Sequence, residues 1–204
     1  SLHLCRMKQF LFLVAILFEC TDPVLAQSTR LAEQRALVEA WSREPMHPAG
    51  DTIGLQLMGD LTVMYMMRSN YDSALVVATN AALAGERILA ATTDMERNKD
   101  VRELLYNVQG FRCMLLRDHG AFDEAIDVGR TVLGHAELLG TADRLAEAYK
   151  ALSLCHVGLD DVGTALLWTR KQLAVVDTSD RLSRSQVLFE MGDQYGALGL
   201  EDSA

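Results

Sequence analysis

Apolar positions recur at helical spacing along most of the chain. Between Leu31 and Ala40, apolar side chains fall at positions that share one face of a helix. No stretch of useful length alternates apolar and polar residues in the manner of a strand. Glycine, proline and short polar clusters interrupt the helical pattern at intervals. The pattern predicts an all-α chain with helices over about 28–43, 52–68, 71–91, 100–118, 122–139, 142–157, 161–176 and 181–197.

Residues that favour helix ends stand at several of these boundaries. We expect Ser28 to cap the first helix, and either Asp51 or Thr52 to cap the second. Thr141 is placed to cap the helix that follows it. The polar residues 92–100 are expected to separate one helix pair from the next.

A small residue returns early in the second helix of each expected pair. The intervals between Ala74, Ala125, Ala165 and Ala204 are 51, 40 and 39 residues, and the polar stretch 92–100 accounts for the longer first interval. A period near 40 fits two helices and two short loops. Two helices approach closely where a side chain is small, and stacking covers the apolar face that each pair leaves exposed. The sequence therefore predicts a stack of similar helix pairs.

The repeated residues resemble the tetratricopeptide repeat family over about residues 51–204. The segments that carry this resemblance are Gly120-Ala121-Phe122-Asp123-Glu124-Ala125, Leu188 to Gly199 with Ala204, Tyr149-Leu152-Ser153 with Asp161-Val162-Gly163-Thr164-Ala165, and Leu61-Tyr65 with Tyr71-Asp72-Ser73-Ala74. The period is longer than the family's usual value of about 34, and the helix-ending proline is absent. The longer period is similar to that of long-period variants in bacterial signalling proteins. The resemblance implies a right-handed α-solenoid of about 3.5 to 4 repeats within 27–204.

The resemblance also implies a groove lined by the first helix of each pair. A peptide or helix of another protein is the natural ligand of such a groove, and the alternative is a solvated face with no ligand. The pattern does not reproduce the Lys/Asn/Arg clamp that some members use on C-terminal carboxylates. The residues expected to line the groove are Gln56, Val63, Met66, Asn107, Met114, Arg117, Lys150, Leu154, Gln186, Phe189 and Asp193.

The first residues of the chain have the pattern of an export signal. Arg6 and Lys8 flank Met7, and residues 10–18 form an unbroken apolar run. This run is shorter than the roughly 20 residues that span a bilayer. We expect cleavage after Ala26, which predicts a periplasmic or extracellular protein; a membrane anchor or a buried core helix is the alternative. No other apolar stretch of spanning length is expected within 27–204.

Charge and cysteine content narrow the possible partners. The net charge is −9 and no basic stripe is visible, which argues against nucleic acid as a partner. Two cysteines follow the predicted cleavage site, Cys113 and Cys155. Each lies in an apolar helical stretch, so a pair of small core residues is expected, with a disulfide as the alternative.

Catalytic and metal-binding patterns were not found in the sequence. The histidines are His3, His47, His119, His135 and His156, and their surroundings predict neither a metal nor a catalytic role. His156 stands where other repeats have tyrosine and is expected to pack. Acidic pairs such as Asp123-Glu124 fall at helix starts, where they complement the helix dipole. We expect a protein without enzymatic activity or cofactors in these 204 residues.

Two functions agree with these patterns. The first is an exported helical-repeat scaffold that binds a protein or peptide. The alternative is the N-terminal sensor or input domain of a larger membrane signalling protein, with a histidine kinase, cyclase or transcriptional regulator as output. In that case a transmembrane helix would follow Ala204, and only then would the membrane be a partner.

Overall fold

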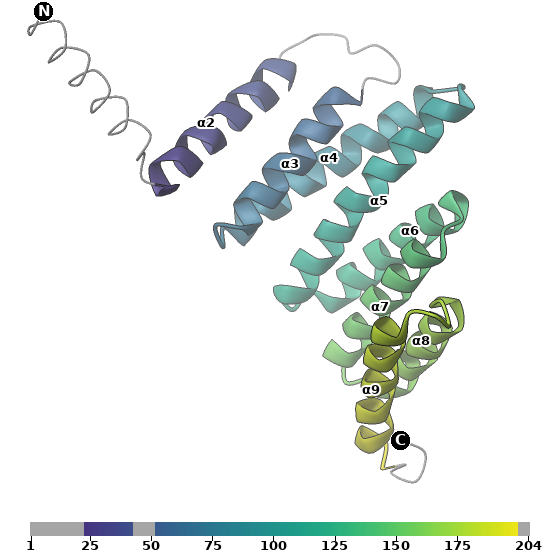
Figure 1. The fold of residues 1–204 in the computed structure, drawn as a ribbon. Coiled ribbons are helices and arrows are strands. Elements are labelled where there is room, and N and C mark those ends of the chain that lie inside the picture. Colours follow the sequence, from purple (N-terminus) through teal and green to yellow (C-terminus); the bar gives the residue numbers. More distant parts are fainter. Residues whose placement is uncertain (1–22, 43–51, 200–204) are drawn as a thin grey trace, which may run out of the picture. The chain divides into compact units, whose positions relative to one another are not determined.

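The computed structural model describes residues 23–42 and 52–199, which form eight helices with no strand among them (Figure 1). The prediction of an all-α chain is confirmed for these residues. The chain divides into two compact units, 1–43 and 44–204. The first unit contains α2 (Pro23–Ser42). The second contains α3 (Ile53–Met66), α4 (Tyr71–Ala91), α5 (Met95–Asp118), α6 (Phe122–Leu139), α7 (Ala142–Gly158), α8 (Val162–Val175) and α9 (Arg181–Ala197).

The structure corrects the expected start of two helices. α2 begins at Pro23, so Ser28 lies inside the helix and does not cap it. Proline suits the first helical position, because the amide hydrogen that it lacks has no partner there. α5 begins at Met95, so most of the polar stretch 92–100 is helical. The Asp94 side chain accepts hydrogen bonds from the amides of Glu96 and Arg97 at 2.9 and 3.3 Å.

Several sequence predictions concern residues outside the described ranges. They are the export signal at 10–18, a cap at Asp51, the histidines His3 and His47, and the repeat position Ala204. Cleavage after Ala26 stays a prediction, since helical structure at this position in the unprocessed chain does not test it.

Side chains cap the second helix of two pairs. The carboxamide of Asn70 accepts from the amide of Ser73 at 3.3 Å, and Asp161 accepts from the amide of Thr164 at 3.2 Å. Thr52 and Thr141 occupy N-cap positions, but neither makes a side-chain capping bond, so the predicted role is not realised.

Each helix from α3 to α8 contacts the next one along the chain. In addition, α3 contacts α5, and α5 contacts α7. Among the described even-numbered helices, α4 does not contact α6 and α6 does not contact α8. The odd-numbered helices α3, α5 and α7 thus lie closer together than the even-numbered ones.

The repeated alanines lie in the core. Ala74, Ala125 and Ala165 are fully buried, as close packing within each pair requires. The aromatic residues three positions earlier are less uniform: Phe122 is half-buried, whereas Tyr71 is exposed. The small residue is therefore the constant feature of the repeat.

Glycines allow close contact between one pair and the next. A Cβ atom on Gly85 would lie 2.6 Å from Leu105 Cδ2, and one on Gly129 would lie 2.9 Å from Leu152 Cδ2. Gly85 and Gly129 belong to α4 and α6, whereas their leucine partners belong to α5 and α7. Leucine side chains thus occupy the space that a larger residue would take at each interface.

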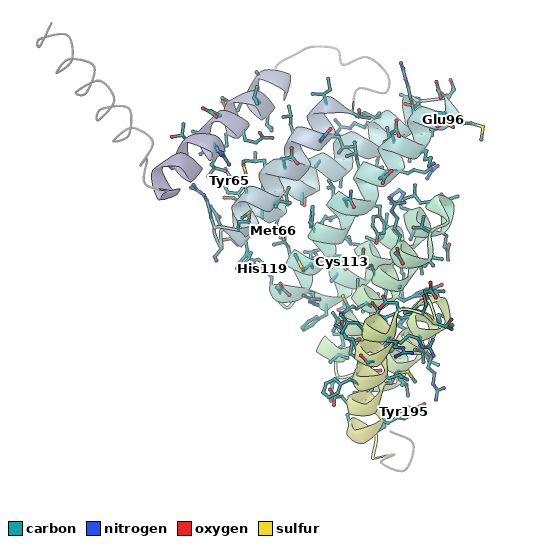
Figure 2. The ribbon with its side chains drawn as sticks, in the orientation of Figure 1. Tyr65, Met66, Glu96, Cys113, His119 and Tyr195 are labelled. Atoms are coloured by element: carbon teal, nitrogen blue, oxygen red, sulfur yellow. The ribbon has the colours of Figure 1, made fainter. Side chains whose placement is uncertain are left out.

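Cys113 and Cys155 are free and buried, with their Sγ atoms 4.0 Å apart. Cys113 lies on α5 (Figure 2) and Cys155 on α7, so the two thiols meet where these helices pack. The prediction that both are core residues is confirmed, and the alternative of a disulfide is absent from the structure.

One described helix, α4 (Tyr71–Ala91), is long and apolar enough to cross a membrane by length and composition alone. This finding corrects the expectation that 27–204 has no other stretch of spanning length. Such a helix is weak evidence for a span, because a core helix passes the same test. α4 contacts both α3 and α5, and its buried residues are Ala74, Ala78, Ala81, Ala82 and Gly85.

Candidate binding groove

Three cavities follow the odd-numbered helices in order. The first, about 260 Å³, lies between α3 and α5. The second, about 320 Å³, lies between α5 and α7. The third, about 400 Å³, lies between α7, the end of α8 and α9.

The second cavity gathers the predicted groove residues most densely. Five of them line it, namely Asn107, Met114, Arg117, Lys150 and Leu154. Those on α5 are three, seven and ten residues apart, so they share a helix face. The structure therefore brings these side chains together, while ligand binding by them stays a prediction.

The other predicted residues are more dispersed. Gln56 and Val63 line the first cavity together with Asn107, and Gln186 lines the third together with Lys150. Met66 is half-buried near the end of α3 (Figure 2) and does not line any of these three cavities. The two remaining residues, Phe189 and Asp193, are exposed on α9 without lining them.

Shared residues connect the three cavities. Asn107 and Phe111 line both the first and the second, and Glu147 and Lys150 line both the second and the third. Each cavity therefore adjoins the next across side chains of one helix, α5 or α7. We call the three together the odd-helix groove.

The polar wall of the second cavity is organised by Tyr106. Its hydroxyl donates to Glu147 Oε2 at 2.8 Å, and the hydroxyl oxygen is 3.2 Å from the Arg144 carbonyl oxygen. Burial, followed by the bond to Glu147, raises the pKa of Tyr106. The phenol therefore stays protonated and can keep donating, which fixes the position of the Glu147 carboxylate between the second and third cavities.

The two cations of the groove already have partners in the protein. Arg117 Nη2 lies 2.7 Å from Asp118 Oδ1, and Lys150 Nζ lies 3.3 Å from Glu190 Oε1. Their positive charge is therefore partly neutralised, which weakens them as receptors for an anionic ligand.

Sequence reasoning missed Tyr106, Phe111 and Glu147 as lining residues. Phe111 lies four residues after Asn107 on the same helix, so the spacing that predicted Asn107 and Met114 also places it on their face. Glu147 lies three residues before Lys150 and seven before Leu154, so the same spacing places it on their face. Its position between two cavities depends on how α5, α7 and α9 pack.

Two of the described histidines, His119 and His156, have hydrogen-bonding partners within the protein. His119 on the turn after α5 (Figure 2) places Nδ1 2.8 Å from the Leu115 carbonyl oxygen and Nε2 3.2 Å from Asp72. His156 is half-buried, as a packing residue should be, and Nδ1 is 3.1 Å from Asp161. In the part of the chain that the structure describes, no group of three or more His, Cys, Asp or Glu side chains is arranged to hold a metal ion.

Comparison with known proteins adds little to this geometry. No protein-family model matches the chain, and no curated protein matches it. Among solved structures, that of BtubC (BKLC) from P. vanneervenii is similar, with 15% identity over 87% of this chain and 86% of that chain and a TM-score of 0.46. The helices of the described residues and their contacts, and not this similarity, show an all-helical protein with a helical-repeat-like arrangement.

Proposed function

We propose that this chain is an exported tetratricopeptide-like scaffold, a right-handed α-solenoid that binds a protein or peptide segment in the odd-helix groove. The contacts between odd-numbered helices support a curved stack. α3, α5 and α7 contact one another in sequence, whereas α4, α6 and α8 do not. A stack of pairs with this asymmetry curves toward the odd-numbered helices, and solenoids use such a concave side for binding.

The observation that carries the proposal is the continuity of the groove. Two residues of α5 and two of α7 each line adjoining cavities, so an extended ligand could occupy all three sites at once. The second cavity offers an apolar floor with Phe111, Met114 and Leu154 beside polar groups. An apolar side chain of a peptide suits such a floor, while nearby polar groups suit its backbone.

Selection of peptides on the intact chain tests this proposal. A random peptide library displayed on phage would be selected against the wild-type protein, and the affinity of recovered peptides measured by calorimetry. Replacement of Met114 by Ala should lower the affinity for recovered peptides by about tenfold, equivalent to about 1.4 kcal/mol of binding free energy. The matched control is Arg130→Ala on α6, outside the groove, which should leave affinity unchanged. Equal binding by the wild type and Met114→Ala, or loss in the control alone, would contradict the proposal.

A second candidate, the input domain of a membrane signalling protein, is favoured by the exposed apolar residues of α9. Leu182 is 80% exposed and Phe189 is 70% exposed. Exposed apolar surface of this kind favours contact with another element. Reading the coding sequence beyond Ala204 distinguishes the candidates: a membrane helix followed by a kinase, cyclase or regulator sequence supports the input domain, and a stop codon after a few further repeats supports the scaffold.

A further inference from the structure

The third cavity of the odd-helix groove is strongly acidic. Four carboxylates line it, from Asp143 and Glu147 on α7 and from Asp177 and Asp180 at the turn before α9. Lys150 is the one cationic side chain in the lining, and it already pairs with Glu190 at 3.3 Å. The lining thus contains more negative charge than the protein itself neutralises.

Hydrogen bonds orient these carboxylates without neutralising them. Asp177 Oδ1 accepts from the Ser179 amide at 2.8 Å, and Asp180 Oδ1 accepts from the Ser183 amide at 3.1 Å. Hydrogen bonds from the Ser179 amide to Asp177, and from the Ser183 side chain and then its amide to Asp180, hold the pKa of both carboxyl groups below their usual range, so both remain ionised at neutral pH. Helix capping explains why an aspartate stands at position 180, the N-cap of α9. It does not explain Glu147, which lies in the interior of α7.

A buried side chain in the same lining lacks a hydrogen-bond partner. Gln172 on α8 is only 6% exposed, and within the described residues its Oε1 atom has no donor. A buried acceptor left unpaired destabilises the protein, because it has lost its hydrogen bond to water. A ligand that donates a hydrogen bond there would recover part of this cost. Carboxylates and an amide oxygen are all acceptors, so the lining calls for a ligand rich in donors and positive in charge.

We propose that the third cavity binds a guanidinium or primary ammonium group, namely the side chain of an arginine or lysine in the peptide that occupies the odd-helix groove. This inference rests on the proposed function, and it adds that the partner places a basic residue next to its apolar one. A cavity of about 400 Å³ has room for such a group. Attraction between the cationic group and the four carboxylates supplies the specificity. This attraction acts only at short range, because salt screens exposed charges beyond about 10 Å.

NMR titration of the full chain tests this site independently of any selected peptide. The probe is N-acetyl-arginine methylamide, and its control is the citrulline analogue, which has nearly the same shape but no charge. The arginine probe should shift the side-chain amide signals of Gln172 and the backbone amides of 177–183 in a saturable manner. The citrulline probe should not. Equal shifts with both probes, or no saturable shift with arginine, would overturn the proposal.

Three variants separate the site from a general loss of structure. Glu147→Gln removes one charge of the lining and should weaken binding of the arginine probe at least about threefold, because one attractive charge pair is lost. Lys150→Gln removes the competing cation and should tighten binding, which a misfolded variant would not do. Glu137→Gln, an exposed acidic residue on α6, is the matched control and should change nothing. Unchanged affinity in both Glu147→Gln and Lys150→Gln would overturn the site.

Spermidine, a free polyamine, distinguishes the two sources of the cationic group. Stronger binding of the arginine probe than of spermidine supports a peptide side chain, and binding of spermidine alone overturns it. If selected peptides bind the groove but carry no basic residue and the arginine probe does not bind, this inference fails while the proposed function stands. If no peptide binds but the arginine probe does, the proposed function fails instead.

Discussion

The Ser153 hydroxyl lies 3.1 Å from the carbonyl oxygen of Ala165 and joins α7 to α8 in the core. Forty residues earlier, Cys113 Sγ lies 3.3 Å from the carbonyl oxygen of Ala125 and joins α5 to α6 in the same way. The repeated alanine therefore does more than permit close packing. It brings its own carbonyl within reach of a small polar side chain on the partner helix.

Replacement of Ser153 by Ala should destabilise the protein by about 1–3 kcal/mol. Ser153 Oγ also lies 2.8 Å from Thr169 Oγ1 and accepts from Gln194 Nε2 at 3.1 Å, so the change leaves buried polar groups unpaired. Urea unfolding followed by circular dichroism measures the effect. Ser185→Ala on the exposed side of α9 is the control and should change stability by less than about 0.5 kcal/mol. Equal stability of the two variants would mean that the buried bonds contribute nothing.

Two glycines of α6 should respond in opposite directions to the same substitution. Gly129→Ala should destabilise by about 1–3 kcal/mol, because its Cβ would lie 2.9 Å from Leu152 Cδ2. Gly134→Ala meets nothing within 4 Å and should stabilise by about 0.5–1 kcal/mol through helix propensity. Thermal unfolding of both variants checks this. A stabilised Gly129→Ala would show that Leu152 moves aside at little cost.

The contribution of His135 to stability should fall as the pH drops below about 6.5. Burial lowers the pKa of this histidine despite Glu86 Oε1 at 3.5 Å from Nε2, and Arg102 lowers it further. The folded chain therefore binds fewer protons at this site than the unfolded chain. The contribution of His135 to the free energy of unfolding is present above its pKa in the unfolded chain. It is lost as the pH falls toward its pKa in the folded chain. Unfolding free energies measured across this range should vary less in His135→Gln.

His119 provides a comparison of opposite sign. Hydrogen bonds to the Leu115 carbonyl and to Asp72 raise its pKa, so its contribution is present below about pH 6.5 and is lost as the pH rises through the folded value. As the pH rises above about 6.5, the stability of His119→Gln should therefore fall less than that of the wild type. A His135→Gln profile that matches the wild type would refute the assigned role of His135.

The thiols of Cys113 and Cys155 should react with a thiol reagent only when the chain opens. Both side chains are at most 1% exposed, and a hydrogen bond with Cys155, followed by burial, raises the pKa of the Cys113 thiol. Since the thiolate is the reactive form, the raised pKa slows the reaction of Cys113, and burial keeps the reagent away from both thiols. Labelling in native buffer should be far slower than in denaturant, where two thiols per chain should react after export processing. Recovery of no free thiol in denaturant would show a disulfide and contradict the structure.

Local sequence signals determined most helix boundaries. α4, α6 and α9 begin and end within a residue of their expected positions, because turn residues and apolar periodicity act over a few neighbours. The start of α5 was missed because residues 96–100 are polar but include good helix formers such as Glu96 and Lys99. Polarity alone does not separate an exposed helix from a loop.

By itself the sequence determined that the chain forms paired helices with small residues at their contacts, and its resemblance to tetratricopeptide repeats predicted one groove for Asn107, Met114, Arg117 and Lys150. Only the tertiary structure decided that their cavities adjoin, that Glu147 stands between two of them, and that Gln172 is buried in an acidic lining without a donor. The reason is physical. Helix formation depends on residues within a turn or two, whereas a cavity depends on the distances and angles between helices that lie about 40 residues apart in the chain.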